Sequence, residues 1–276
     1  MSEKFPRLSS PRLWSGLTLA GAALGVGLAG SADAEAYKLI MPGQSGVWLA
    51  QAEGGEGGEA GAIADVDEDT AYLVQLEIVE GHLVAALALY DLGMTDEAIS
   101  LSYDPEAEMM DEVRAALAAH GAADITPLMT DFSDAMEKKA GAEAVSAALT
   151  SFRTAVATAV RAANPGLKTR FAIVTALSKA AADEISGAIE NGVVTDDMAY
   201  NEAQAFLRIA LRDAENIQRD LATADKAAAD RAGRIAGLIA QEPLPFARTE
   251  TGFVAFDPAI ILSLAARVEL IASQVR

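Results

Sequence analysis

The sequence TAYLVQLEIVEGHLVAALALYDLG, residues 70–93, sets the fold class of this chain. Its large apolar residues recur at intervals of three and four positions, from Leu73 through Leu83 to Tyr90. This spacing places them on one side of an α-helix. Gly93 ends the run, because glycine readily adopts the left-handed conformation that follows many helices. We therefore predict an amphipathic helix that begins at Thr70.

The same periodicity continues toward the C-terminus, interrupted by glycine, proline and capping residues. The further predicted helices cover residues 95–102, 105–121, 124–139, 142–163, 167–190, 195–241 and 259–275. Within the longest, the Ala- and Asp-rich part at 222–232 leaves a bend open. With 51% apolar but only 5% aromatic residues, the composition also favours helices. We predict an all-α fold, a bundle of seven to eight helices built from helical hairpins.

The N-terminal part of the chain has a different character. Residues 1–34 resemble a secretory signal peptide, with three basic residues before the apolar stretch 13–28 and small residues at Ala32 and Ala34. An uncleaved signal that anchors the chain in the membrane is the alternative. Residues 35–69 contain EGGEGGEAG (residues 53–61) and are predicted to be a flexible acidic linker. Residues 70–276 form the predicted helical domain, with a possible subdivision at Asn164-Pro165-Gly166.

Charge and cysteine content exclude several classes of function. The chain has 40 Asp and Glu against 21 Lys and Arg, a net charge of −19, so nucleic acid is not an expected partner. It has no cysteine and two histidines, which excludes disulfides, thiolate metal sites and a three-histidine site within one chain. Cations and basic proteins are the favoured partners. Export without cysteines suggests a bacterial periplasm, although adaptation to a saline habitat would produce the same acidity.

His82 is a candidate metal ligand in the first predicted helix. Imidazole with two or three carboxylates suits iron, manganese or zinc, and its second ring nitrogen then needs a hydrogen-bond acceptor. The Glu-x-x-His pattern of di-iron bundles is missing, since Val79 stands three residues before His82. A buried histidine that serves packing alone is the competing interpretation, and His120 is expected to cap a helix. The acidic residues that could surround His82 are Glu77, Glu80, Glu108 and Glu112.

A second set of carboxylates lies where one predicted helix ends and the next begins, around Gly192. Asp183, Glu184 and Glu202 belong to it, and Glu184 stands next to the apolar stripe, where a charged group needs a partner or a cation. Asp196 is better explained as a helix cap. The alternative is that the whole set is solvated. The sequence has no Gly-x-Ser-x-Gly motif and no phosphate-binding loop, so we do not expect an enzyme.

The segments Ala182-Asp183-Glu184-Ile185, Gly192-Val193-Val194 and Ala199-Tyr200-Asn201-Glu202-Ala203-Gln204-Ala205-Phe206 resemble the helical extracytoplasmic domain of bacterial high-affinity iron permeases. Gly81-His82-Leu83, Pro105 and Glu108 are similar to an uncharacterised group of secreted helical proteins of alphaproteobacteria. These resemblances imply a periplasmic accessory protein that binds iron or another divalent cation and serves an inner-membrane iron permease. The implied metal ligands are His82, Glu108, Asp183, Glu184 and Glu202. The alternative is an acidic interaction module that binds no ligand and meets a basic periplasmic protein.

Overall fold

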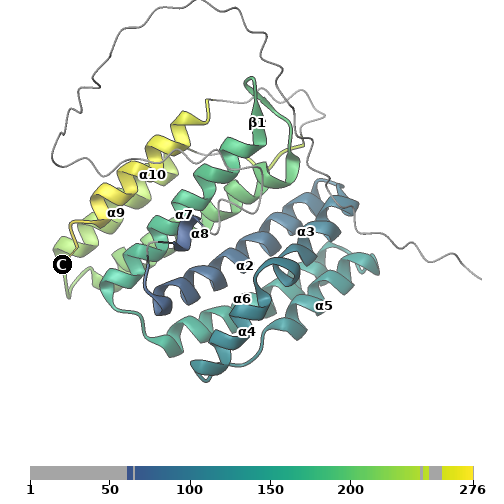
Figure 1. Ribbon diagram of the computed structural model, residues 1–276, viewed down its shortest axis with the longest axis horizontal. Helices are drawn as coiled ribbons and strands as arrows, with labels where there is room; N and C mark the ends of the chain where they lie inside the picture. Colours follow the sequence, from purple (N-terminus) through teal and green to yellow (C-terminus); the bar gives the residue numbers. More distant parts are fainter. Residues whose placement is uncertain (1–60, 65, 243–244, 249–256, 276) are drawn as a thin grey trace, which may run out of the picture. The chain divides into compact units, whose positions relative to one another are not determined.

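The computed structural model describes residues 61–64, 66–242, 245–248 and 257–275. The predicted signal peptide and the linker up to residue 60 lie outside this range. The described part is an all-α bundle with one β-hairpin, whose two strands have two residues each (Figure 1). Its elements are α2 (Glu68–Asp91), α3 (Thr95–Glu108), α4 (Met110–Ala119), α5 (Thr126–Glu137), α6 (Ala142–Ala163), α7 (Leu167–Ala188), β1 (Ile189–Glu190), β2 (Val193–Val194), α8 (Asp197–Leu221), α9 (Lys226–Ala240) and α10 (Ala259–Ala272).

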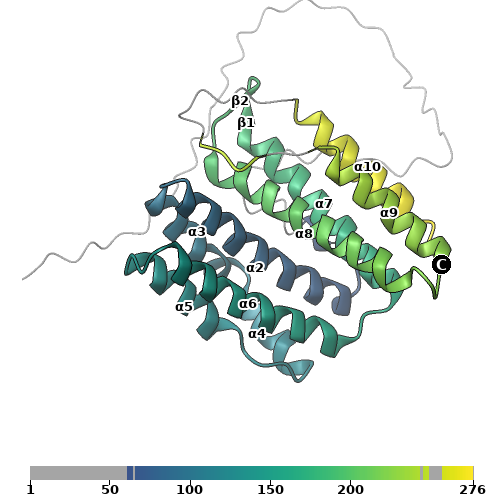
Figure 2. The ribbon, with the colours of Figure 1, turned by 180° about the vertical axis from the view of Figure 1, so that it is seen from behind.

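Helix α2 is the central element of the bundle. It packs against α3, α6, α7 and α8, and the two opposite views show it between α6 and the α7–α8 pair (Figures 1 and 2). Seventeen of its 24 residues are buried, so the prediction of an amphipathic helix with one buried side is wrong for α2. Its apolar residues face neighbours all round. Among the described helices, α2 alone is long and apolar enough to cross a membrane. The rest of the protein buries 89% of the most apolar 18-residue stretch of this helix.

The ends of α2 follow from local chemistry. The Asp67 side chain caps the helix by accepting a hydrogen bond from the Thr70 amide at 3.0 Å, so the helix begins at Glu68, two residues before the predicted start. At the other end Gly93 has a φ of +79°, as predicted from its position after the apolar run. The Met94 amide then donates to the Leu89 carbonyl at 2.9 Å and closes the turn into α3.

Two predicted helix boundaries are wrong. Pro105 was expected to start a helix but lies inside α3, and the break comes at Met109, whose φ is −137°. The predicted helix 195–241 is two helices, α8 and α9, because Asp225 caps α9 by accepting from the Ala228 amide at 3.0 Å. This break lies within the Ala- and Asp-rich residues 222–232, where the sequence allows a bend. The described residues accordingly contain nine helices of ten residues or more, where seven to eight were predicted.

The connection between α7 and α8 is a β-hairpin that the sequence analysis did not predict. Ile189 pairs with Val194, and Glu190 pairs with Val193, in an antiparallel arrangement. The two residues of the turn, Asn191 and Gly192, have φ angles of +51° and +78°. Asn-Gly is the favoured pair for a tight two-residue hairpin because both positions require positive φ. Beyond the hairpin, the Asp196 side chain caps α8, as predicted.

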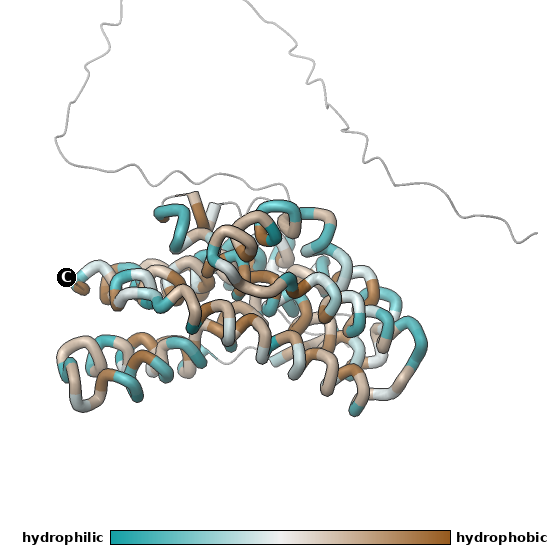
Figure 3. Tube along the Cα trace, turned by 90° about the horizontal axis from the view of Figure 1, so that it is seen from below, coloured by the Kyte–Doolittle hydropathy of each residue, from teal (hydrophilic) through white to brown (hydrophobic). Residues whose placement is uncertain are grey.

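A single hydrophobic core runs through the described bundle. Hydrophobic and hydrophilic residues alternate along each helix (Figure 3), and the apolar ones of α7, α8, α9 and α10 pack together beside α2. The buried amide of Asn201 holds the segment 245–248 against this core, since it both donates to and accepts from the backbone of Ala247 at 3.0 Å. The fully buried aromatic side chains of the core are Phe132, Phe152, Phe171, Tyr200 and Phe206.

Candidate functional site

His82 lies in the middle of α2 and is 2% exposed. Its Nδ1 is 3.0 Å from the carbonyl oxygen of Ile78, one turn earlier in the same helix. A carbonyl oxygen only accepts hydrogen bonds, so Nδ1 carries the proton of this bond. The other ring nitrogen, Nε2, is therefore either an open lone pair or a second N–H group.

Two carboxylates from other helices face Nε2 of His82. Glu202 of α8 places Oε1 at 3.1 Å, and Glu108 of α3 places Oε2 at 3.9 Å. Glu202 is largely buried, whereas 31% of the Glu108 side chain is exposed. Asp104, one turn before Glu108, is near enough for its charge to interact with that of His82; burial raises the pKa of Asp104 and a protonated His82 opposes the rise. Two acidic side chains thus lie within 4 Å of Nε2, and the charge of a third, Asp104, acts on the imidazole.

The close approach of α2 and α8 brings His82 and Glu202 together. Gly81 makes this approach possible, because a Cβ atom there would lie 2.3 Å from Cε1 of Phe206. The Phe206 ring also meets the His82 imidazole edge to face, with centroids 6.0 Å apart. Glu202 stands one turn before Phe206 on α8, so the same contact orients its carboxylate toward Nε2.

Three of the five metal ligands implied by the resemblance are brought together: His82, Glu108 and Glu202. The other two lie on α7. Asp183 is half-buried beside Gly61 and Lys179, and burial raises its pKa against the opposing charge of Lys179. Glu184 is 4% exposed on a helix that packs against both α2 and α8. Within the described residues, no group of three or more His, Cys, Asp or Glu side chains has the arrangement of a metal site.

The distances from Nε2 of His82 to the two carboxylates show which of them could share a metal ion with it. Two ligand atoms bound to one ion at about 2.1 Å each lie roughly 3 Å apart, which the His82–Glu202 pair already satisfies at 3.1 Å. Glu108, at 3.9 Å, is farther from Nε2 than a shared ion would place it. With a proton on Nε2, His82 is a cation bonded to Glu202. Without that proton, Nε2 is a nitrogen ligand beside two carboxylates.

Three of the carboxylates considered as neighbours of His82 lie elsewhere. Glu112 accepts a hydrogen bond from Gln75 at 3.0 Å. Glu77 and Glu80 bond to Arg212 of α8 on another side of α2. Glu77 and Glu80 are five and two residues before His82, and side chains at these spacings point to different sides of a helix. The helical period alone therefore indicates that they do not face the histidine's partners.

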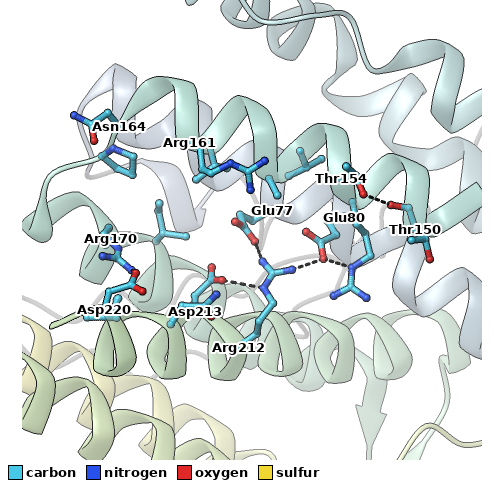
Figure 4. A pocket seen from close by; sticks show the side chains of 18 residues that line it. Glu77, Glu80, Thr150, Thr154, Arg161, Asn164, Arg170, Arg212, Asp213 and Asp220 are labelled. Carbon is cyan, nitrogen blue, oxygen red and sulfur yellow. Dashed lines mark hydrogen bonds and ion pairs between the residues drawn. The ribbon is translucent and has the colours of Figure 1, made fainter. Parts of the chain in front are cut away.

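Glu77 and Glu80 belong to a second charged cluster, between α2, α6 and α8 (Figure 4). The guanidinium of Arg212 donates to Glu77, to Glu80 and, at 2.9 Å, to Asp213. Arg153 of α6 donates from Nε to the same Glu80 oxygen at 2.8 Å. Three carboxyl groups therefore share two guanidinium groups.

Burial and the neighbouring Asp213 carboxylate raise the pKa of Glu77 well above its ordinary value, despite its bond to Arg212. Burial also raises the pKa of Asp213, which Arg212 opposes. Burial acts in the same direction on both groups, because the charged form of a carboxyl group is the one that loses its hydration. Glu77, with 6% of its side chain exposed against 17% for Asp213, is the more buried of the two.

This cluster opens into a groove of about 820 Å³ between α6 and α8, with α2 behind it (Figure 4). Arg161, Thr150 and Thr154 line the α6 side, and Arg170 with Asp220 closes one end. Apolar side chains of α6, α7 and α8 complete the walls. Such a volume lies within the range of small-molecule sites in proteins.

Comparison of the chain with protein-family models, with curated proteins and with solved structures finds no match. Sequence reasoning missed Arg212 and Arg153, although one signal was present: two glutamates three residues apart, within an apolar helix, require basic partners. His120 is the C-cap of α4, as expected, and its ring stacks on Tyr72 at 4.5 Å.

Proposed function

We propose that this chain is a periplasmic helical accessory protein that binds a metal cation, iron in our proposal, and takes part in iron uptake. The ligands are His82, Glu202 and Glu108, with Asp183 and Glu184 as further carboxylates on α7, and the protein acts as a binding protein rather than an enzyme. The observation that carries the proposal is the orientation of His82, whose Nε2 is turned toward two carboxylates while Nδ1 is bonded to a carbonyl oxygen. Histidines that bind metals have their second nitrogen held in this way.

Cation binding requires Nε2 without a proton, because its lone pair is the ligand. Glu108 has to approach for this, and its partial exposure leaves its side chain room to turn. A mixed nitrogen and oxygen donor set suits iron, manganese and zinc. The net charge of −19 also raises the concentration of cations near the protein. Because the imidazole has to lose a proton, cation binding is expected to strengthen as the pH rises.

The location and the partner rest on the sequence. The predicted signal peptide favours the periplasm, and the resemblance of residues 182–206 to the permease domain favours an inner-membrane iron permease as the partner that receives the cation. We also infer that the bundle is built from helical hairpins. The consecutive pairs α2–α3, α5–α6 and α7–α8, whose members pack against each other, support this inference.

The test is the metal content of the protein purified from periplasm, followed by calorimetric titration of the metal-stripped protein with ferrous, ferric, zinc and manganese ions. We expect about one tight site per chain, lost in His82→Ala and weakened in Glu202→Gln. His120→Ala is the matched control, because it removes the other imidazole and leaves His82 in place. Circular dichroism checks that each variant is folded.

Two results would contradict the cation site. One is weak binding without a defined stoichiometry that moderate salt removes equally from the parent protein and all variants, as expected for a diffuse acidic surface. The other is tight binding that His82→Ala and His120→Ala leave unchanged, which would move the site away from His82.

A second candidate function is an acidic interaction module that meets a basic periplasmic protein. Helix α10 favours it, since three of its large apolar side chains, Ile260, Leu262 and Leu270, are 40%, 40% and 65% exposed. Exposed apolar surface can mark a contact surface for another protein. Crosslinking from α10 in living cells tests this function; a crosslinked partner that is lost in Leu270→Glu, with no tight cation site, would favour it over cation binding.

A further inference from the structure

The groove between α6 and α8 has an unusual balance of charge for this protein. The chain as a whole carries 40 acidic side chains against 21 basic ones. In the groove the numbers are equal, with four of each kind. The basic ones are Arg153, Arg161, Arg170 and Arg212, and the acidic ones are Glu77, Glu80, Asp213 and Asp220. The groove is thus much richer in basic side chains, relative to acidic ones, than the chain as a whole.

Two of the four arginines have donor groups that the protein itself does not use. Arg153 bonds to Glu80 through Nε, and its two Nη groups make no hydrogen bond with the described residues. Arg161 donates only to the Thr158 hydroxyl, at 3.0 Å, and forms no ion pair with any carboxylate in the described range. Arg212 is fully engaged by comparison, and Arg170 is paired with Asp220 at 2.7 Å.

The positions of these two arginines limit the shape of a ligand. Arg153 and Arg161 are eight residues apart on α6, which is about 12 Å along a helix axis. Between them, Ala157 and Val160 of α6 line the groove, and the carboxyl groups of Glu77 and Glu80 lie deeper, bonded to Arg212. A ligand that meets both guanidinium groups is elongated, with negative charge at its two ends and an uncharged middle.

We propose that this groove binds an elongated organic dianion, a dicarboxylate with a hydrocarbon middle, whose two carboxylates bond to Arg153 and Arg161. Guanidinium groups bind carboxylates through paired, charge-assisted hydrogen bonds. The hydrocarbon middle packs on Ala157 and Val160. The site is separate from the cation site, because His82 faces Glu108 and Glu202, whereas Glu77 and Glu80 face this groove.

The probe is nonanedioate, a straight dicarboxylate whose length suits the spacing of the two arginines. Calorimetric titration of the purified protein is expected to show saturable binding of one molecule per chain. Arg161→Gln is expected to weaken binding at least about tenfold, since one charge-assisted contact is lost. Arg267→Gln, which removes an exposed arginine of α10, is the matched control and is expected to leave binding unchanged. The diol of the same chain length is expected not to bind.

Three results would overturn the proposal. The first is the absence of saturable binding up to about 10 mM nonanedioate, a concentration at which affinity is negligible. The second is equal binding to Arg161→Gln, Arg153→Gln and the parent protein, each shown by its thermal melt to be folded. The third is equally tight binding of nonanoate, the monocarboxylate, because a single carboxylate cannot reach both arginines.

Discussion

At the scale of single residues, the cluster around Arg212 is the most sensitive part of the molecule. Three carboxyl groups, those of Glu77, Glu80 and Asp213, depend on two guanidinium groups, and Glu77 and Glu80 are almost completely buried. Buried ionic groups are costly unless every one of them is paired. Both the stability of the protein and its dependence on pH should therefore respond to small changes here.

The pH dependence has a definite sign. The pKa of Glu77 is raised well above its ordinary value of 4.5, mainly by burial, so the folded protein holds a proton that the unfolded chain releases. The stability contributed by this proton is complete below pH 4.5 and is lost as the pH rises through the folded-state pKa. We expect Glu77→Gln, which mimics the protonated form, to flatten this decline in chemical denaturation measured at a series of pH values. Glu215→Gln, an exposed change on α8, should keep the decline; equal slopes in the two variants would refute the assignment.

Replacement of Arg212 should have a larger effect. Arg212→Gln leaves Glu77 and Asp213 without their guanidinium partner in a buried place, and breaking such a pair costs about 3–5 kcal/mol. The free energy of unfolding in urea measures this loss. Arg219→Gln, on the same helix, should change it by less than about 0.5 kcal/mol, because within the described residues the Arg219 side chain bonds to Asn216 alone. A loss of similar size in both variants would show that the cluster is not a special determinant of stability.

At the scale of helices, the contact between α2 and α8 positions the candidate cation site. It depends on the absence of a side chain at Gly81, where the ring of Phe206 occupies the space. Glycine in the interior of a helix costs up to about 1 kcal/mol relative to alanine. The gain from close packing of the two helices offsets this cost.

Two glycine-to-alanine replacements distinguish the effect of close helix packing on stability from that of helix propensity. Gly81→Ala places a Cβ atom 2.3 Å from Phe206 and should lower the free energy of unfolding by about 1–3 kcal/mol. Gly237→Ala, in α9, meets nothing within 4 Å and should raise it by up to about 1 kcal/mol. Urea denaturation is expected to show changes of opposite sign in the free energies of unfolding of the two variants. A stabilising effect of Gly81→Ala would mean that α2 and α8 are not in close contact.

The helices could be predicted from the sequence, whereas the contacts between distant helices could not. Periodicity predicted the helices themselves, because apolar spacing is a local property of the chain. The break before α9 was only anticipated as a bend, since a capping aspartate in an Ala-rich segment is a weak local signal. The pairing of His82 with Glu202 joins residues 120 positions apart, and periodicity contains no information on such contacts; the two were grouped by resemblance alone. Arg212 was missed because its partners had been assigned to the histidine.

At the scale of the whole molecule, α2 links the two halves of the sequence. It packs on α3 and α6 from the first half and on α7 and α8 from the second. The sequence Asn164-Pro165-Gly166, which suggested a possible division of the domain, only connects α6 to α7. The core on either side of this connection includes side chains of α2.

We therefore expect the described bundle to unfold in one cooperative transition. Differential scanning calorimetry should give equal calorimetric and van't Hoff enthalpies. A fragment that ends at Asn164 should lack a cooperative melt, because it leaves the α7 and α8 sides of α2 exposed to water. Two separate transitions, or a cooperatively folded fragment, would show that the halves are independent domains.

The burial of α2 has a consequence for export. A helix of 24 residues with a mean hydropathy of 1.4 over its most apolar window resembles a membrane-spanning segment to the machinery that moves unfolded chains across a bilayer. Each charged side chain near the middle of such a segment opposes its transfer into lipid by about 3 kcal/mol. If the chain is exported as we propose, Glu77 and Glu80, which bond to arginines in the folded protein, are the groups expected to keep α2 out of the membrane during translocation.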